Sequence, residues 1–303
     1  MKVSVVIPVL NAERHLPALL PALFGQQPRP PDEVLLLDSM STDRTRAIAA
    51  GFPGVRVLPV EKFCHSGTRN VGAREAQGDV VVLMTQDALP RDVYWLAALL
   101  APLADPAVAA AYSRQVPYPD ANPMEQFFLR THFPPEPAVR RATGSGALGL
   151  RDVFFSNVSG VVRRDLLLRH PFDERLIMSE DQQLSRDLMA AGHAVAYAAD
   201  SVVTHSHNYT LSVCFRRYFD SVYSLTQVFP AHGMGTSAGM GASYVGRELG
   251  WMVRHHPHWL PYYVLYNGAK VAGTLAAHYA EKMPRSWARL QPAPVLLGLM
   301  RPG

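Results

Sequence analysis

The chain has 303 residues, of which 48% are hydrophobic and 18% are charged, so it can bury a sizeable core and is not a disordered chain. Its two cysteines, Cys64 and Cys214, exclude a disulfide scaffold and a cysteine-rich zinc site. The sequence predicts no signal peptide and no membrane-spanning helix, so we expect a cytoplasmic protein.

Charge is unevenly distributed along the chain. The formal net charge is +4, but residues 1–210 carry 20 Lys and Arg against 22 Asp and Glu, whereas residues 211–303 carry 9 against 3. The basic segment is also rich in aromatic residues and histidine. Such a segment favours an anionic partner, either membrane headgroups or nucleic acid, and a solvated basic helical tail is the alternative.

Short apolar runs alternate with helical patterns over the first 110 residues. The predicted strands are Val3–Ile7, Val34–Leu37, Val55–Val60 and Val80–Met84. Three helices are predicted. The first begins after Asn11, which stands where an N-cap would, the second begins after Ser41, and the third spans Thr68–Ala76. Strands separated by helices imply right-handed crossovers and a parallel sheet, so we expect an α/β fold.

The second half of the chain is less regular in its pattern. Pro117–Gly149 is rich in proline and glycine and is predicted to be a long irregular segment, such as a lid or an acceptor-site loop. Order is expected to return at Val153–Phe155, in helices at Asp165–Arg169 and from Ser179, and in strand-like Ala194–Ala198 and Val202–Val203. After Tyr209 the chain is predicted to be helical, with an interruption at Gly233–Gly246.

Several polar residues follow predicted strands, where ligands bind in open α/β sheets. Asp38 ends the second strand, Asp87 follows the fourth, and Asn11 follows the first. No GxGxxG follows the first predicted strand, no GxxxxGK[ST] occurs, and no GxSxG nucleophile elbow follows a predicted strand, which disfavours the usual dinucleotide, P-loop and serine hydrolase sites. The segment His65–Asn70 opens a helix, so its backbone N–H groups and Arg69 are placed to meet phosphate oxygens.

Five segments in this order resemble the family 2 glycosyltransferases of the GT-A fold: VVIPVLN, LLLDSMSTDRT, FCHSGTRNVGAREAQGD, LMTQDALP and SEDQQLSRDLMAAGH. The sequence in and around the segments FCHSGTRN, TQDALP, SRQ, FFSN and HSHNY is similar to that of bacterial rhamnosyltransferases. Those enzymes extend surface polysaccharides from a dTDP-activated sugar. The resemblance implies a catalytic domain at 1–210 with a Rossmann-like, mostly parallel sheet. Residues 211–303 would then form a helical, basic C-terminal extension.

The resemblance also implies a donor site. The residues that it assigns to nucleotide-sugar binding are Pro8, Asn11, Asp38, Gly67, Arg69, Asn70, Gln86 and Asp87. Asp38 would contact the nucleoside, and its alternative role is to cap a helix or turn. Asp87 matches the last acid of a DxD-type motif, here Thr85-Gln86-Asp87, and would hold Mg²⁺ or Mn²⁺ together with waters and the diphosphate. Its alternative role is a loop-capping aspartate.

For the chemistry, the resemblance implies that Asp181 is the catalytic base and that Glu180 and Asn157 contact the acceptor or the sugar. The alternative for Glu180 and Asp181 is a pair of acids favoured by a helix N-terminus. His205 would be a further metal ligand. His207 is expected to be structural, because residues two apart in an extended chain point to opposite sides.

These observations predict an inverting, metal-dependent glycosyltransferase with dTDP-rhamnose as donor and a saccharide or lipid-linked saccharide as acceptor. The alternatives are a UDP-hexose or UDP-N-acetylhexosamine transferase of the same fold and a non-catalytic sugar-nucleotide-binding protein. Nucleic acid is disfavoured because residues 1–210 are not basic. The aromatic and basic stretch Ser243–Met283 is expected to contact the inner face of the cell membrane, or else to pack against the core or a second copy in a homodimer.

Overall fold

The computed structural model describes residues 1–142, 148–150, 152–229 and 234–280, with the backbone alone for 234–240 and 242. Two compact units divide the chain. The first consists of Met1–Val116, Phe133–Arg175 and Glu180–His205, and the second of Pro117–His132, Leu176–Ser179 and the chain from Ser206 onward. The division after His205 lies near the domain boundary expected at residue 210, whereas the two earlier segments of the second unit were not expected. The domain assignment itself stays a prediction.

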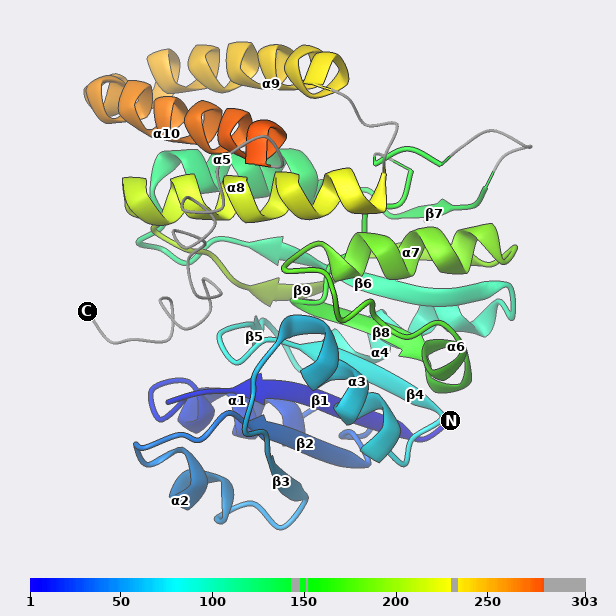
Figure 1. Ribbon diagram of the computed structural model, residues 1–303. Coiled ribbons are helices and arrows are strands. Elements are labelled where there is room, and N and C mark those ends of the chain that lie inside the picture. The colour runs from blue at the N-terminus through cyan, green and yellow to red at the C-terminus, as the bar shows by residue number, and fades with distance from the viewer. Residues whose placement is uncertain (143–147, 151, 230–233, 281–303) are drawn as a thin grey trace. The chain divides into compact units, whose positions relative to one another are not determined.

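The first unit is built on a nine-stranded sheet with the order β3-β2-β1-β4-β8-β6-β9-β5, in which β7 also pairs with β9 (Figure 1). The strands are β1 Val3–Val9, β2 Glu33–Asp38, β3 Val55–Pro59, β4 Val80–Met84, β5 Leu89–Pro90, β6 Val108–Val116, β7 Ala138–Arg140, β8 Ser159–Arg163 and β9 Ala194–Thr204. Strands β1 to β4 are parallel, and β8 lies antiparallel between β4 and β6. The carboxyl ends of β1, β2 and β4 therefore share one edge of the sheet.

Helices cover both faces of this sheet, which is why every residue of β1 and β4 is buried and all but Ser4 are apolar. The helices of the first unit are α1 Leu16–Phe24, α2 Thr45–Ala49, α3 His65–Glu75, α4 Trp95–Leu100, the 3-10 turn η1 Ala101–Ala104, α6 Arg164–Arg169 and α7 Glu180–Ala190. In Figure 1, α3, α6 and α7 lie in front of the sheet and α1 and α4 behind it. Leu16, Leu19, Leu20 and Leu23 of α1 are fully buried against the sheet, as their helical spacing predicts.

The second unit is helical. Its elements are α5 Pro123–His132, α8 Leu211–Val228, α9 Met234–His255, the 3-10 turn η2 Pro257–Trp259 and α10 Leu260–Tyr279. Its core contains Met124, Cys214, Met252, Tyr263 and Tyr266. At Gly273 a Cβ would collide with the backbone of Phe215, so glycine is what lets α10 pack this closely on α8. No helix within the described ranges is both long and apolar enough to span a membrane.

Three predictions about irregular segments are wrong. Pro117–Gly149, expected to be irregular, contains α5 and β7, and α5 starts at a proline because the first helical turn needs no N–H donor there. Its residues 143–147 lie outside the described part. Gly233–Gly246, expected to interrupt the helices, is helical from Met234 onward, and Gly233 lies outside the described part. Val153–Phe155, where order was expected to return, forms neither a helix nor a strand.

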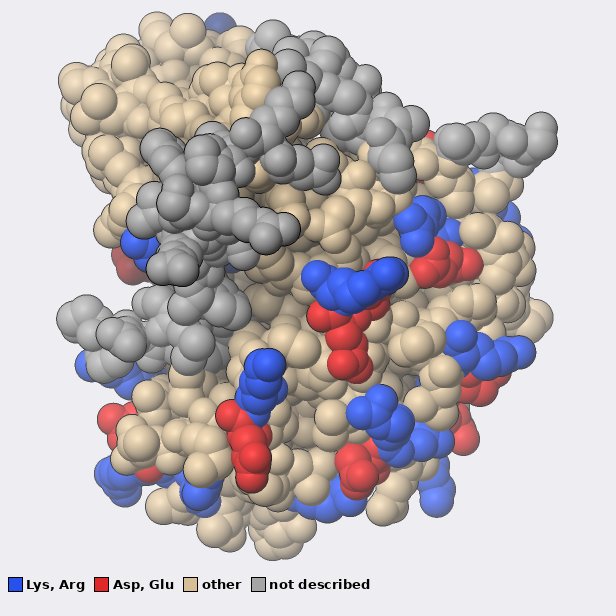
Figure 2. All heavy atoms as spheres, viewed as in Figure 1, with Lys and Arg blue, Asp and Glu red and all other residues tan. Residues whose placement is uncertain are grey.

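Several predicted boundaries also differ. Asn11 is not an N-cap: it has φ 50°, and α1 starts five residues later. The helix expected at Thr68–Ala76 starts at His65, because the Cys64 thiol accepts a hydrogen bond from the Gly67 N–H at 3.1 Å. The two strand-like segments between Ala194 and Val203 are one strand, β9. Figure 2 shows acidic and basic side chains interspersed over the first unit.

Candidate active site

The loops after β1 and β2 are joined by side-chain hydrogen bonds. The Asn11 N–H donates to the Ser41 hydroxyl at 2.9 Å, and the Thr42 N–H donates to Asn11 Oδ1 at 2.9 Å. The Ala12 N–H donates to Thr45 Oγ1 at 2.7 Å. Asn11 has a left-handed backbone, which asparagine tolerates better than most residues. These hydrogen bonds join the two loops and define their shape at the sheet edge.

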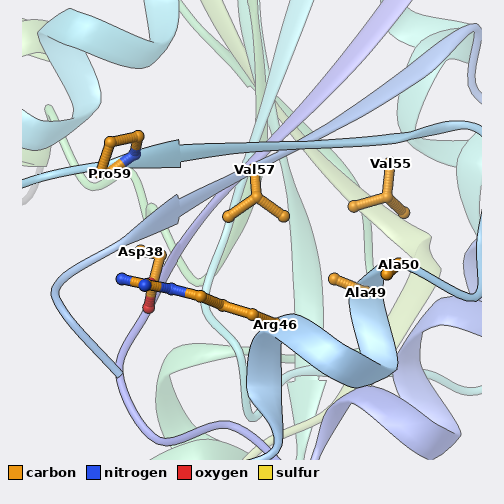
Figure 3. Close-up of a pocket in the computed structure, with 7 residues that line it drawn as sticks. All are labelled: Asp38, Arg46, Ala49, Ala50, Val55, Val57 and Pro59. Carbon is orange, nitrogen blue, oxygen red and sulfur yellow. The ribbon is translucent and has the colours of Figure 1, made fainter. Parts of the chain in front are cut away.

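Asp38 lies fully buried at the end of β2. One oxygen accepts the Ser41 N–H at 3.1 Å, so the capping role weighed above is present, and the other pairs with Arg46 at 2.5 Å. Asp38 and Arg46 point toward each other at one end of a hollow, and its remaining lining is apolar (Figure 3). The other lining residues are Ala49, Ala50, Val55, Val57 and Pro59. The hollow holds about 670 Å³, including the part open to solvent.

Gln86 holds the end of β1. The Leu10 N–H donates to Gln86 Oε1 at 2.9 Å, and Gln86 Nε2 donates to the Leu10 carbonyl at 3.3 Å. Pro8 lies within β1, opposite Leu37 of β2. Gln86 thus positions the loop that follows β1, and direct contact of Gln86, Pro8 or Asn11 with a nucleotide stays a prediction.

Asp87 and His205 lie together, as a shared metal site requires. Asp87 Oδ1 is 3.7 Å from His205 Nε2. Two ligands of one Mg²⁺ or Mn²⁺, each about 2.1 Å from the ion, lie about 3.0–4.2 Å apart, so this pair fits a hard divalent cation. One ligand atom each from Asp87, His205 and His207 lie within 4.8 Å of one another.

The expectation that His205 and His207 point to opposite sides is therefore wrong. Strand β9 ends at Thr204, so the extended geometry does not continue through these residues. The His207 N–H donates to Glu125 of α5 at 3.3 Å instead. His207 joins the residues able to hold a cation.

Gln115, at the end of β6, was not among the predicted site residues. Its Oε1 lies 2.9 Å from His205 Nδ1, and its Nε2 donates to the Ser156 hydroxyl at 2.9 Å. With the amide oriented this way, Nδ1 carries the proton and Nε2, the nitrogen nearer Asp87, has its lone pair free for a metal. Gln115 and Ser156 therefore set the tautomer in which His205 can act as a ligand.

We expect Gln115→Leu to weaken Mn²⁺ binding by about tenfold or more, because the loss of such outer partners typically costs 10–100-fold. Isothermal titration with Mn²⁺ measures this, and Gln115→Glu, which keeps the acceptor oxygen, should retain most of the affinity. Equal affinity in Gln115→Leu and the unaltered protein would contradict the role assigned to Gln115.

Glu180 is buried at the start of α7, directly after Ser179, which has φ 64°. Its carboxylate pairs with Arg69 at 3.3 Å and accepts from Asn157 Nδ2 at 3.1 Å. Burial alone would raise the pKa of Glu180, but the positive charges of His65 and Arg69 hold that pKa below its usual value. Glu180 is therefore a fixed negative charge.

Two polar atoms beside Glu180 are buried without a hydrogen-bond partner: Asn157 Oδ1 and Arg69 Nε. Buried polar atoms are normally satisfied, so both are candidates for contacts with a bound ligand. Gly67 and Asn70, in contrast, have structural explanations. A Cβ at Gly67 would lie 2.7 Å from the Cys64 sulfur, and Asn70 exchanges hydrogen bonds with the backbone of Phe172. Their donor contacts stay predictions.

Asp181 follows Glu180 and is half-buried. One of its oxygens accepts the Gln182 N–H at 3.0 Å. Burial and the neighbouring charge of Glu180 raise the pKa of Asp181 to about 7. A carboxylate with a pKa in this range can both take and hold a proton at neutral pH, which suits a general base.

The sequence model of Glycosyl transferase family 2 matches residues 4–168, more than half of the chain. The chain belongs to this family. The transferase is 32% identical to the O-antigen chain rhamnosyltransferase RfbN of Salmonella typhimurium, over 95% of this chain and 93% of the relative. It is also 32% identical to the O-antigen chain rhamnosyltransferase WbaN of Salmonella anatum, over 88% of this chain and 86% of the relative.

Solved structures agree in fold. The mannosyltransferase PcManGT from Pyrobaculum calidifontis, in complex with GDP-Man and Mn²⁺, superposes on the transferase with a TM-score of 0.62 at 18% identity, over 92% of this chain and 87% of that one. TarS residues 1–349 of S. aureus, in complex with UDP, has a TM-score of 0.54 at 17% identity, over 96% and 88%. The expected GT-A fold and glycosyltransferase class are confirmed.

Proposed function

We propose that the transferase moves L-rhamnose from dTDP-rhamnose, with inversion, to a hydroxyl of a saccharide or lipid-linked saccharide in surface polysaccharide synthesis. The two relatives at 32% identity, both named rhamnosyltransferases, support the sugar. The observation that carries the chemistry is Asp181, a half-buried carboxylate whose pKa is raised to about 7.

In the proposed reaction, the acceptor hydroxyl attacks the anomeric carbon of the sugar as its proton passes to the Asp181 carboxylate. The bond from that carbon to the diphosphate breaks on the opposite face, and dTDP leaves with the electron pair, so the configuration inverts. Asp87, His205 and His207 would hold Mg²⁺ or Mn²⁺, which when bound screens the charge of the diphosphate. Three neighbours were solved with Mn²⁺, one of them with GDP-Man and two with UDP.

Around the donor, Asp38 would accept from the nucleoside, with the apolar lining of its hollow beside it. The Arg69–Glu180 pair would order the opposite part of the site, and Asn157 Oδ1 would accept a hydrogen bond from a sugar or acceptor hydroxyl. Holding Asp181 next to Glu180 costs stability once both are ionised. A protein that only binds sugar nucleotides has no use for that cost, which favours turnover over the non-catalytic alternative.

We place the enzyme in the cytoplasm at the inner face of the cell membrane, where lipid-linked acceptors would be met, with no nucleic acid partner. The UDP-sugar alternative has its support in TarS, which was solved with UDP-GlcNAc.

A donor panel tests the proposal. The protein is incubated with dTDP-rhamnose, dTDP-glucose, UDP-glucose and UDP-N-acetylglucosamine, and nucleoside diphosphate release is measured with Mn²⁺, with Mg²⁺ and with excess chelator. We expect metal-dependent release from dTDP-rhamnose above all, and NMR of the product should show the inverted anomer. Release from a UDP-sugar alone supports the alternative donor, and no release from any donor in the presence of metal and acceptor extract contradicts an enzymatic role.

A further inference from the structure

One face of α10 is apolar and exposed. Its exposed large side chains are Val264, Leu265, Val271, Leu275 and Tyr279, each between 43% and 67% exposed. Gly268 and Ala272 are exposed between them, so the positions recur at helical spacing and form one stripe. No charged residue interrupts this stripe.

The opposite face of α10 already supplies the packing of the helical unit. Tyr263, Tyr266, Gly273 and Ala277 are its buried positions. A helix that is apolar all round is normally covered on every side, and a long exposed apolar stripe marks an interaction surface. The outer stripe is therefore not explained by the folding of the unit to which it belongs.

Helix α9 also has exposed apolar side chains. Leu249 and Val253 are exposed, one turn apart, and Arg247 and Arg254 are exposed on the same helix. The two acids among the described residues from 206 to 280, Asp220 and Glu248, are both buried. No acidic side chain is visible over α9 and α10 in Figure 2. The exposed formal charges of this region are therefore all positive.

Of the aromatic residues expected to meet the membrane, Tyr279 is exposed in the α10 stripe, but most of the others are packed into the helical unit. Tyr263 and Tyr266 are buried in the core of the helical unit, and Trp251, Trp259 and Tyr262 pack partly buried against it. Lys270 pairs with Glu248 at 3.4 Å rather than facing solvent. This is the packing alternative weighed for these residues, and Lys282 and Met283 lie outside the described part. Among the described residues of this unit, the α10 stripe is therefore the apolar surface best placed for a membrane contact.

We infer that the outer face of α10, together with Arg247 and Arg254 of α9, binds the surface of a membrane that carries anionic headgroups. Aliphatic side chains would enter the interface while the arginines meet the headgroups. The absence of exposed carboxylates over described residues 206–280 favours an anionic lipid surface over a second copy of the chain, which would bring the same positive charges. The inference rests on the proposed function in one respect: membrane binding would give the enzyme access to a lipid-linked acceptor.

Co-sedimentation with vesicles of rising phosphatidylglycerol content tests it, using the full chain. We expect binding that increases with anionic lipid and falls with salt. Val271→Asp and Leu265→Asp should each bind at least about fivefold more weakly, because a negative charge is introduced beside an anionic surface. Val139→Asp is the matched control: Val139 is 56% exposed against 55% for Val271, but it lies in β7 of the other unit. The double variant Arg247→Gln/Arg254→Gln should lose most of the dependence on lipid charge.

Vesicle binding that is equal for Val271→Asp and Val139→Asp, or that ignores lipid charge, would overturn the inference. Sedimentation equilibrium without lipid tests whether a second copy of the chain binds the stripe instead. A dimer that Val271→Asp dissociates would assign the stripe to that second copy and would also overturn the inference. Thermal melting confirms that each variant is folded. Turnover of dTDP-rhamnose with a soluble saccharide acceptor should be the same in all variants, so loss of the proposed activity and loss of vesicle binding are read separately.

Discussion

Asp181→Asn should lower turnover by about 100-fold or more, because a positioned general base typically contributes 10²–10⁴-fold. Asparagine keeps an oxygen that can accept the Gln182 N–H, as Asp181 does, but it cannot take a proton. The measurement is the steady-state release of nucleoside diphosphate with saturating donor and acceptor. Donor affinity, followed by calorimetry, should change little.

The matched control is Asp187→Asn. Asp187 is a half-buried acid on the same helix, two turns farther on, where it pairs with Arg186 at 2.7 Å. It should retain nearly full turnover. Near-normal turnover in Asp181→Asn, or an equal loss in Asp187→Asn, would remove Asp181 from the role of base.

The pH dependence of the unaltered enzyme also tests the assignment of Asp181 as the base. Since the pKa of Asp181 is raised to about 7, the carboxylate is mostly protonated below that pH, and kcat/KM should fall about tenfold per pH unit there and level off above it. Asp181 also costs stability as pH rises from about 4 to 7, because over that range the unfolded chain ionises it more readily than the folded one. Asp181→Asn should therefore melt at a higher temperature than the unaltered protein at pH 8, so that lost activity cannot be blamed on unfolding.

Asp87→Asn and His205→Gln should each weaken Mn²⁺ binding in the presence of donor by about tenfold or more and lower turnover with it, since each removes one of the few proposed protein ligands. His207→Gln should cost less than His205→Gln, because Gln115 orients the His205 ring and His205 is the more buried of the two. Isothermal titration with Mn²⁺, and turnover as a function of Mn²⁺ concentration, measure these effects.

Two variants with the same substitutions at positions outside the proposed metal site serve as controls. Asp92→Asn removes an exposed turn aspartate five residues from Asp87, and His193→Gln removes the histidine at the opposite end of β9 from His205. Both should bind Mn²⁺ normally. Full turnover of the unaltered enzyme in excess chelator would reject the metal site, and a larger loss in His207→Gln than in His205→Gln would move the principal ligand by two residues.

The positions of the residues at the edge of the sheet were the easiest to predict from the sequence. Asp38 ends a run of buried β-branched and leucine residues, so its place at the end of β2 follows from the pattern. Gln115 was missed because β6 is rich in alanine, which has a low strand preference, and the strand was not predicted. The hydrogen bonds from Gln115 to His205 and Ser156 join residues 41 to 90 positions apart, which no local pattern can predict.

The helical unit shows why local preference fails elsewhere. Each glycine in a helix costs about 1 kcal/mol relative to alanine, so the glycines of α9 argue against a helix. The helix forms because Met252 is fully buried and Trp251 packs against Phe127 of α5. Tertiary packing of this kind outweighs local preference and involves residues more than 120 positions apart.

The hydrogen bonds between the loops after β1 and β2 bear on how quickly a nucleotide binds. Asn11, Ser41 and Thr45 already hold these loops together, so little ordering remains for the ligand to bring about. For the proposed donor site we therefore expect association in a single step, with an observed rate that rises linearly with donor concentration and reaches no plateau. For the same reason, if the hollow holds the nucleobase as proposed, we expect a change of base preference to come from exchanging small residues such as Ala49 and Ala50 along it, with the loops left as they are.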